Sequence, residues 1–446
     1  MRHRKADNII YLADKVQIHP RQEALKKLWD VSYNCKNVWN RLNQAIKEEG
    51  RKLSELKGML PVLKQEDKCL KVPSSQVLQE VALQLREAWK SFWSKRKNGD
   101  KDANPPGYKS YKFFFTHTYP QNGVSFEFTG NVLRLAYGKN KRDWIEIEIP
   151  KRDYSWTGVK IVRIRYDKSQ NKWYAILTRE VKVPEVREDG HVIFFDPGCR
   201  TTLTGIKTDF TVHEYDLNPL RRANLKLYQA IDVLKSQRDH KQKGSRRWRR
   251  LNARIRRIHR IIRTRTHHYI HKLANRILED HPDVREFRVG DWNKQDTLAD
   301  TGYRFVDRHI NRLVQNLNPI RKLVDCLNYK ARKVAQAVSD INEWGTSDTC
   351  LNCDHVLPEG LPVSRTVFRC PICGFHLHRD ILAGFNMFKK EFVALWQGLR
   401  GKSISLSIVR ISLDPISCEN RRPARRTITM SFPGCHPELP ECSVSV

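Results

Sequence analysis

Hydrophobic residues follow two different spacings in the first 186 residues of the chain. Residues 7–20 have the pattern of a short strand ending at Pro20, and the apolar positions of residues 22–49 and 74–92 recur at helical intervals. Beyond residue 104 the pattern changes to alternation, in VSFEFTGNVLRLAYG, WIEIEIP, VKIVRIRYD and KWYAILTREV. This half therefore predicts a helical insertion within an antiparallel β-domain, a small barrel that the N-terminal strand closes.

The second half of the chain predicts a unit of mixed helices and strands. The continuous apolar run HVIFFDPG, residues 191–198, is typical of a central strand buried on both faces. Residues 225–278 keep helical spacing without a proline, VREFRVGDW predicts another strand, and a last helix begins at Asp380. The final segment, 396–446, contains SISLSIVRISL and then many Pro, Ser and Arg residues, and we expect a largely disordered tail.

The charge of the chain points to a polyanionic partner. Lysine and arginine number 82 against 49 aspartates and glutamates, so the net charge is +33. Such an excess favours a nucleic-acid partner over the alternatives, a basic membrane-surface protein or a ribosome-associated factor, and no small-molecule substrate is expected. No apolar run approaches the roughly 20 residues that a membrane span needs. We therefore expect a nucleic-acid-binding protein with no membrane partner.

One helical stretch concentrates this charge. Between Lys235 and Arg265 the only acidic residue is Asp239. A charged run is often only a solvated helix face, but one as one-sided as this favours contacts with phosphates. The candidates for these contacts are Arg246, Arg247, Arg249, Arg250, Arg254 and Arg257.

Four of the eleven cysteines have the spacing of a metal site. Cys350 and Cys353 form one C-x2-C pair, Cys370 and Cys373 form another, and sixteen residues separate the pairs. Two such turns present four thiolates to a tetrahedral zinc ion. Because four thiolates leave no open position for water, we expect one structural zinc. The other cysteines are scattered, so a disulfide framework is not expected.

Two carboxylates are candidates for catalysis. Nucleases of the RNase H type hold divalent metal with carboxylates that meet at strand and helix ends, where two ions about 3.5–4 Å apart clamp the attacking and leaving oxygens. Asp196 closes the buried apolar strand, where an ionised carboxylate is costly unless it is paired or metal-bound. Asp380 begins the last helix, where an aspartate could equally be an N-cap. Spacing alone leaves the role of Asp380 open.

Three segments resemble landmarks of the TnpB family of RuvC-type nucleases, in the same order along the chain. They are FFDPGCRTTLTGI, TSDTCLNCDH and CPICGFHLHRDILAGFNMFKK. The similarity covers about residues 8–392 and implies that Asp196 and Asp380 are magnesium ligands. It also implies a bound guide RNA that pairs with one strand of double-stranded DNA beside a short flanking motif, within a basic channel.

The sequence departs from the bacterial TnpB pattern at the second carboxylate. Gly290 stands where that family has a glutamate on the middle strand. Asp291 points to the opposite face of that strand, and Glu286 lies about 13 Å away along it. The Fanzor proteins, the eukaryotic branch of the family, are similar in having an inert residue at the old position and a glutamate before the TS-x-x-C motif. On that resemblance Glu343 is the third ligand; otherwise Glu343 is a loop residue and the protein an inactive binder.

These observations predict an α+β multidomain protein with a β-barrel wedge, a helical recognition insertion, and an RNase H-like (RuvC) nuclease domain with an inserted four-cysteine zinc ribbon. The expected divisions are a wedge at 1–20 and 105–186, a recognition domain at 21–104, a nuclease domain at 187–345 and 376–395, a ribbon at 346–375 and a tail at 396–446.

The expected activity is RNA-guided DNA cleavage by two magnesium ions held by Asp196, Glu343 and Asp380. The alternatives are a guide-dependent DNA-binding regulator that does not cut, which Gly290 favours, and a zinc-ribbon RNA-binding protein with no DNA target. We expect a monomeric ribonucleoprotein. The resemblance to the eukaryotic branch implies work in the nucleus.

Overall fold

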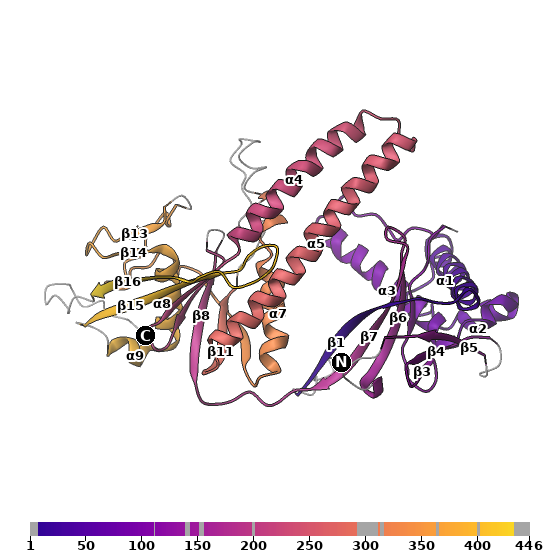
Figure 1. The fold of residues 1–446 in the computed structure, drawn as a ribbon, viewed down its shortest axis with the longest axis horizontal. Helices are drawn as coiled ribbons and strands as arrows, with labels where there is room; N and C mark the ends of the chain where they lie inside the picture. The colour runs from indigo at the N-terminus through magenta and orange to yellow at the C-terminus, as the bar shows by residue number, and fades with distance from the viewer. Residues whose placement is uncertain are drawn as a thin grey trace. The chain divides into compact units, whose positions relative to one another are not determined.

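The computed structural model describes residues 8–110, 112–138, 143–150, 156–198, 201–291, 311–312, 316–362, 365–398 and 402–431. The chain divides into two compact units, Met1–Lys182 and Val183–Val446. Figure 1 shows the strands and helices of each unit. Among the described residues, no helix is long and apolar enough to cross a membrane.

The first unit combines the predicted wedge and recognition segments. Strand β1 (Ile9–Ile18) pairs along its whole length with β7 (Lys172–Lys182), as expected of an N-terminal strand that completes the β-domain. The sheet order is β1-β7-β6-β2, and β3, β4 and β5 form a second sheet. The remaining strands are β2 (His117–Tyr119), β3 (Phe126–Thr129), β4 (Val132–Ala136), β5 (Trp144–Glu148) and β6 (Val159–Asp167).

The helices of this unit share one hydrophobic core with its strands. Trp39 of α1 and Trp89 of α3 are buried in that core together with Val16 and Leu177 of the sheet. Trp89 packs within the unit, and its indole nitrogen donates to the Asn43 side chain at 2.9 Å. The helical insertion is therefore packed as part of the same compact unit as the wedge. Its elements are α1 (Gln22–Glu48), α2 (Leu60–Glu66), η1 (Lys68–Lys71) and α3 (Ser75–Lys97); η2 (Trp156–Gly158) precedes β6.

The second unit is built on a seven-stranded sheet of order β12-β11-β8-β9-β10-β15-β16. The run HVIFFDP forms the central strand β8 (His191–Pro197), and both faces of it are buried as its continuous apolar character requires. Strand β11 runs parallel to β8, and β12 runs parallel to β11. The strands that precede the C-terminal pair β15 and β16 are β9 (Leu203–Lys207), β10 (Val212–Asp216), β11 (Val284–Gly290) and β12 (Ala337–Ile341).

Helices cover both faces of this sheet. Ile193 and Phe195 point into a core with helices α5 and α7, whereas Phe194 points to the opposite face and packs against Phe388 of α8. Helices α4 and α5 run side by side as a long hairpin (Figure 1) with apolar residues between them. The helices are α4 (Asn218–Asp239), α5 (Arg246–Asp280), α7 (Ile320–Arg332), α8 (Arg379–Glu391) and α9 (Val393–Gln397).

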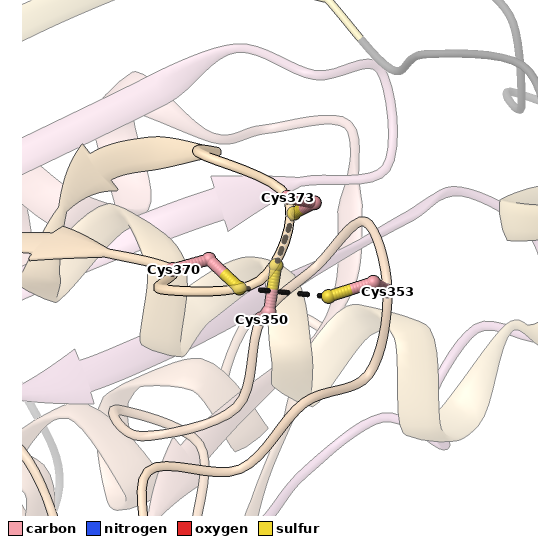
Figure 2. A group of neighbouring side chains, drawn as sticks. All are labelled: Cys350, Cys353, Cys370 and Cys373. Carbon is pink, nitrogen blue, oxygen red and sulfur yellow. Dashed lines mark hydrogen bonds between the residues drawn. The ribbon is translucent and has the colours of Figure 1, made fainter. Parts of the chain in front are cut away.

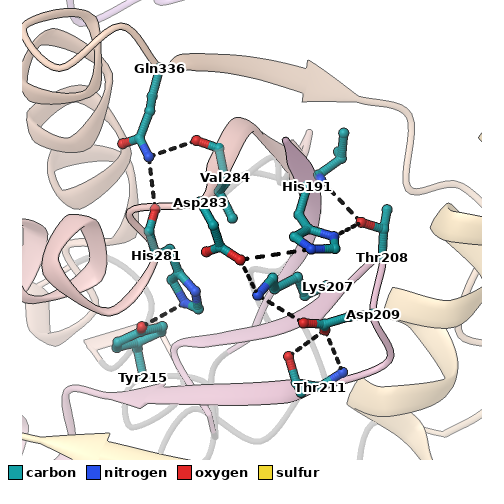
Figure 3. Close-up of polar contacts among 11 residues, drawn as sticks. His191, Lys207, Thr208, Asp209, Thr211, Tyr215, His281, Asp283, Val284 and Gln336 are labelled. Atoms are coloured by element: carbon teal, nitrogen blue, oxygen red, sulfur yellow. Dashed lines mark hydrogen bonds and ion pairs between the residues drawn. The ribbon is translucent and has the colours of Figure 1, made fainter. Parts of the chain in front are cut away.

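A polar network joins the strands at the edge opposite the carboxyl end of β8 (Figure 3). Lys207 at the end of β9 lies 2.6 Å from the Asp283 carboxylate and 2.8 Å from that of Asp209. The Tyr215 hydroxyl lies 2.9 Å from Nε2 of His281, which is buried. These contacts tie β9 and β10 to the loop before β11. They stabilise the sheet at the amino end of β8, whereas the acidic residues lie at its carboxyl end.

The expectation of a disordered tail is wrong for residues 403–431. Strand β15 (Ser403–Ser412) pairs in parallel with β10, and β16 (Ala424–Ser431) pairs antiparallel with β15. The physical reason is the alternation in SISLSIVRISL, which buries Leu406 and Ile408 on the α8 face of the sheet. Residues 432–446 and 399–401 lie outside the described part of the chain.

Candidate active site

The predicted acidic residues lie around the carboxyl ends of neighbouring parallel strands. Asp196 is the penultimate residue of β8, and Gly290, the last residue of β11, lies beside it because Val289 pairs with Phe195. Gly290 in turn pairs with Ile341, the last residue of β12, and Glu343 follows two residues later. The carboxyl edge of parallel strands is where ligands bind in open sheets of this kind.

The Glu343 side chain fills the space that a side chain at position 290 would occupy. A β-carbon added to Gly290 would overlap a Glu343 carboxylate oxygen and lie 3.3 Å from the Glu343 β-carbon. It would also lie 2.9 Å from Cδ of Pro197, the residue after Asp196. The sequence predicted that Glu343 compensates for Gly290. The geometry brings the two positions into contact and makes glycine, which has no side chain, necessary at 290 for this conformation of Glu343.

Asp380 reaches the same edge from helix α8. The helix packs over β8 and β9, and Gly384 allows this approach because a β-carbon there would lie 2.5 Å from Cγ1 of Ile206. Asp380 stands in the first turn of α8, and no side-chain hydrogen bond caps the helix at His378. Its carboxylate interacts instead with the Thr201 side chain. The N-cap alternative is therefore not the arrangement adopted.

Burial raises the pKa of each of the three carboxylates. Burial, followed by the charges of Asp380 and Glu343, raises the pKa of Asp196. Burial and the charge of Asp291 raise the pKa of Glu343 to about 7. Burial also raises the pKa of Asp380, although His378 and Arg379 oppose the shift. A cluster of acids that resist ionisation in the absence of a cation is typical of a metal or catalytic site.

Oxygen Oε2 of Glu343 is buried and has no hydrogen-bond partner among the described residues. Such an atom is costly unless something pairs with it, and a hard divalent cation is a suitable partner for a carboxylate oxygen. In the described part of the chain, however, only the four cysteines are gathered tightly enough to form a ligand set by themselves. The three carboxylates lie at one end of the sheet, but their oxygens are farther apart than the four sulfur atoms are.

The rejected alternatives to Glu343 have other positions. Glu286 accepts a hydrogen bond from the Ser339 hydroxyl at 2.6 Å and lies 3.2 Å from Arg288. Asp291 is exposed, and its backbone amide bonds the Ile341 carbonyl at 2.9 Å. Trp344, next to Glu343, is 84% exposed. The Glu343 side chain, by contrast, packs against Gly290.

The four predicted zinc ligands come together in the ribbon (Figure 2). All four sulfur atoms lie within 4.8 Å of one another, with Cys350 and Cys373 3.6 Å apart and Cys353 and Cys370 3.5 Å apart. Backbone turns hold them, since the Cys370 amide donates to the Phe375 carbonyl at 2.8 Å. Strands β13 (Val367–Arg369) and β14 (His376–His378) flank the second pair. This is the donor set of a tetrahedral thiolate site.

The arginine-rich face of α5 is open to solvent. The six predicted phosphate-binding residues are all exposed, and none belongs to an ion pair among the described residues. The opposite face packs on α4 through Ile255 and Ile262. These residues are Arg246, Arg247, Arg249, Arg250, Arg254 and Arg257.

Glu214 on β10 lies near this site and was not predicted from the sequence. Its side chain is 1% exposed and pairs with Arg410 and Arg426. Its charge contributes to the raised pKa of Asp380. An acid inside the short pattern VHEYD gave a weak signal, because nothing local indicated its two distant partners.

Two segments of the chain match models of known protein families. The family model described as "Probable transposase" (OrfB_IS605) matches residues 175–298, and "Cas12f1-like, TNB domain" matches residues 321–387. The first segment contains β8 to β11, and the second contains Glu343, the ribbon and Asp380.

Related sequences come from a bacterium and a virus. The "Putative RNA-guided DNA endonuclease InsQ" of Escherichia coli (strain K12) is 25% identical over 330 residues, which are 72% of this chain and 76% of that protein. "TnpB-like protein L79" of Acanthamoeba polyphaga mimivirus is 22% identical over 234 residues, 52% of this chain and 43% of its own. The chain thus spans less than half the length of the viral relative.

A solved structure has the same fold. The Cas12f1 chain of a cryo-EM complex with sgRNA and target DNA matches with a TM-score of 0.57 and 12% identity, over 85% of this chain and 99% of that one. The predicted fold class, a RuvC-type nuclease fold with an inserted cysteine ribbon, is confirmed. In this order along the chain, residues 175–298 are similar to the OrfB_IS605 probable-transposase family and residues 321–387 to the Cas12f1-like TNB domain.

Proposed function

We propose that this protein is an RNA-guided, metal-dependent DNA endonuclease whose ligands are Asp196, Glu343 and Asp380. The observation that carries the proposal is the packing of Glu343 into the space beside Gly290, next to the strand end that bears Asp196. This packing supplies a carboxylate where the strand itself has none. The Escherichia coli relative that is described as a putative RNA-guided DNA endonuclease supports the same reaction class.

The donor set fits magnesium. The three side chains are carboxylates, one of their oxygens is buried without a partner, and the pKa values of all three are raised by burial, with mutual repulsion adding to the shift at Asp196. Bound magnesium would supply a Lewis acid and an activated water for phosphodiester hydrolysis. We propose two ions, with products that carry a 5′-phosphate and a 3′-hydroxyl.

The chain's own residues hold and orient the reacting groups. Asp196 is fixed by the central strand, and Asp380 by the docking of α8 on β9. The positive charge of Arg379 lies near both aspartates, and its guanidinium is 3.4 Å from the Leu361 carbonyl oxygen. A cation held in this way can stabilise negative charge that develops on a phosphate. Arg379 is therefore the candidate for the phosphate-facing positive group.

Guide RNA and double-stranded DNA are the proposed partners, with a short flanking motif read on the DNA. The net charge of +33 and the open arginine face of α5 support binding to nucleic-acid backbone. The matching Cas12f1 structure is a complex with sgRNA and target DNA. The four cysteines would hold one structural zinc ion. We propose that the active particle contains one copy of this chain.

Membership of the Fanzor branch is a finer proposal. It rests on the pairing of an inert residue at 290 with Glu343, since the relatives compared above are bacterial and viral. A nuclear site of action would follow from that branch.

Gly290 also favours a second function, that of an RNA-guided DNA-binding regulator that does not cut. Glu343 would then be a loop residue without a catalytic role. The burial of its unpaired oxygen beside Asp196 argues for the enzyme, because a merely structural glutamate would be expected to have a hydrogen-bond partner.

The test is cleavage of a guide-matched plasmid by the full chain loaded with guide RNA, with and without magnesium. Asp196→Asn, Glu343→Gln and Asp380→Asn should bind the target but lose cleavage by at least about 100-fold. Asp340→Asn is the matched control, because Asp340 is an exposed acid on the neighbouring strand β12.

The outcomes separate the two functions. Cleavage by the wild type and by Asp340→Asn, with loss in the three variants, supports the nuclease. Guide-dependent binding by the wild type without cleavage would establish the regulator instead. Full activity of Glu343→Gln would remove Glu343 from the site.

A further inference from the structure

A row of side chains crosses the sheet from the acidic site to the C-terminal hairpin. Asp196 pairs with Thr204, Thr204 with Glu214, and Glu214 with Arg410, on β8, β9, β10 and β15. Directly paired residues point to the same face of a sheet. At about 4.8 Å per strand, Arg410 begins about 14 Å from Asp196. The row therefore leads from the candidate metal ligands to a basic group on the same face.

Glu214 holds two arginines at the end of this row. Its carboxylate is 2.6 Å from Arg410 on β15 and 2.8 Å from Arg426 on β16. Arg426 pairs with Ile408, which is buried on the α8 face, so both arginines lie on the face that carries Asp196. The two oxygens of one buried acid thus fix two guanidinium groups side by side.

The charges of this cluster do not balance. Glu214 is 1% exposed and contributes one negative charge, whereas the arginine side chains are 46% and 50% exposed and contribute two positive charges. A buried carboxylate needs a partner, but one arginine would be enough for that. The second arginine therefore adds a positive charge that Glu214 does not neutralise. Both guanidinium groups are held in a fixed orientation by Glu214 and are partly exposed to solvent. Arginine forks of this kind match the oxygens of a phosphate.

We propose that Arg410 and Arg426, held on Glu214, bind a backbone phosphate of the DNA strand that is cut, a short distance from the scissile bond. The C-terminal hairpin is then a substrate-binding part of the nuclease unit. It lies beyond both segments matched by the family models, which end at residues 298 and 387. This inference rests on the proposed nuclease function for the identity of the bound strand.

The first variant is Arg426→Gln, which removes the surplus charge and leaves the Arg410–Glu214 pair intact. Its matched control is Arg425→Gln, with the same change in net charge on the adjacent residue. Arg425 pairs with Val409, which packs against the core on the opposite face of the sheet. A second variant combines Glu214→Gln, Arg410→Gln and Arg426→Gln, so that no buried charge is left unpaired.

The measurement is phosphate interference with the full chain loaded with guide RNA. Each phosphate near the cut is replaced in turn by an uncharged methylphosphonate, and both DNA affinity without magnesium and cleavage with magnesium are recorded. In the wild type, one position should weaken binding by about tenfold, the size of a charge-assisted contact. Arg425→Gln should keep this sensitive position, and Arg426→Gln and the combined variant should lose it.

The inference is overturned if the wild type has no sensitive phosphate, or if Arg426→Gln and the combined variant keep the wild-type pattern. It is also overturned if the sensitive phosphate belongs to the guide RNA when the same replacement is made there. The wild type could bind DNA with a sensitive phosphate and yet not cleave. If Arg426→Gln and the combined variant then lose that sensitivity, the contact is supported and only the nuclease function is rejected. Absence of DNA binding by the wild type would reject both.

Discussion

Replacement of Gly290 by alanine should disable the candidate active site while the sheet remains folded. The added methyl carbon would overlap the Glu343 carboxylate and lie 2.9 Å from Pro197 Cδ and 3.3 Å from Glu343 Cβ. Ordinary carbon contacts are about 3.5–4.0 Å, so one or both neighbours must move by several tenths of an ångström or more. Because about 1 Å of misplacement can cost about 100-fold in rate, we expect a loss of about 10- to 100-fold in cleavage.

A glutamate at 290 provides the sharper version of this test. Gly290→Glu alone should be impaired, since its side chain and that of Glu343 compete for one space, and Glu343→Ala alone should be inactive. The double variant Gly290→Glu plus Glu343→Ala should recover cleavage relative to either single variant, because one carboxylate then occupies the space. This non-additivity is the expected sign of direct contact.

The assay is single-turnover cleavage of a guide-matched duplex, with target binding and thermal unfolding measured in parallel. Gly107→Ala is the control, because a β-carbon at Gly107 meets nothing within 4 Å. Wild-type cleavage by Gly290→Ala, in a background where Glu343→Ala is inactive, would refute the reasoning that position 290 must be empty for Glu343 to act.

Four further predictions concern the rest of the chain. Cys370→Ser should lose the one zinc ion per chain that metal analysis measures and should unfold at a lower temperature. The control is Cys69→Ser, at an exposed cysteine outside the ribbon, which should keep the zinc. Equal metal content in both variants would contradict the four-thiolate site. Gly384→Ala should destabilise the second unit by about 1–3 kcal/mol in urea unfolding, because its β-carbon would lie 2.5 Å from Cγ1 of Ile206. If the changes in unfolding free energy caused by Gly384→Ala and Ile206→Ala add in the double variant, that contact is contradicted. Burial lowers the pKa of His281 to about 3, whereas the unfolded residue titrates near 6.5, so the folded protein binds fewer protons. The unfolding free energy should therefore fall as pH drops below 6.5, by about 2 kcal/mol at pH 5. His281→Gln should remove this part of the pH dependence, and an unchanged pH dependence would show that the residue is not buried as a neutral imidazole. Substitution of glutamine at Arg249, Arg250, Arg254 and Arg257 should weaken nucleic-acid binding and reduce its salt dependence by about 0.7–0.9 for each phosphate that is no longer neutralised, and an unchanged salt dependence would mean that this face is only solvated.

Local patterns along the chain were enough to predict the features that depend on residues close in sequence. The two C-x2-C turns bring four thiols together because each pair is set by its own short backbone turn. The continuous apolar run before Asp196 predicted a strand buried on both faces, and β8 is that strand. The alternation of residues 124–181 predicted the strands of the first unit, and helical spacing predicted α3 and α5.

Composition misled the prediction for the C-terminal segment. Its Pro, Ser and Arg residues suggested disorder, although SISLSIVRISL alternates as a strand does. A two-stranded hairpin such as β15–β16 is at best marginally stable by itself in water, so its stability depends on a further partner strand. That partner is β10, some two hundred residues earlier in the chain, and no local pattern indicates the pairing.

The sequence by itself determined the cysteine ribbon, the buried strand that ends in Asp196, and the basic surface of the chain, because each depends on residues that are close in sequence or on total charge. For Glu343 it offered a resemblance and two rivals. Only the tertiary structure decided that Glu343 packs against Gly290, that α8 brings Asp380 to the same edge, and that Glu214 holds Arg410 and Arg426. These contacts join strands and helices far apart in the chain, and their register is set by burial of whole faces of the sheet.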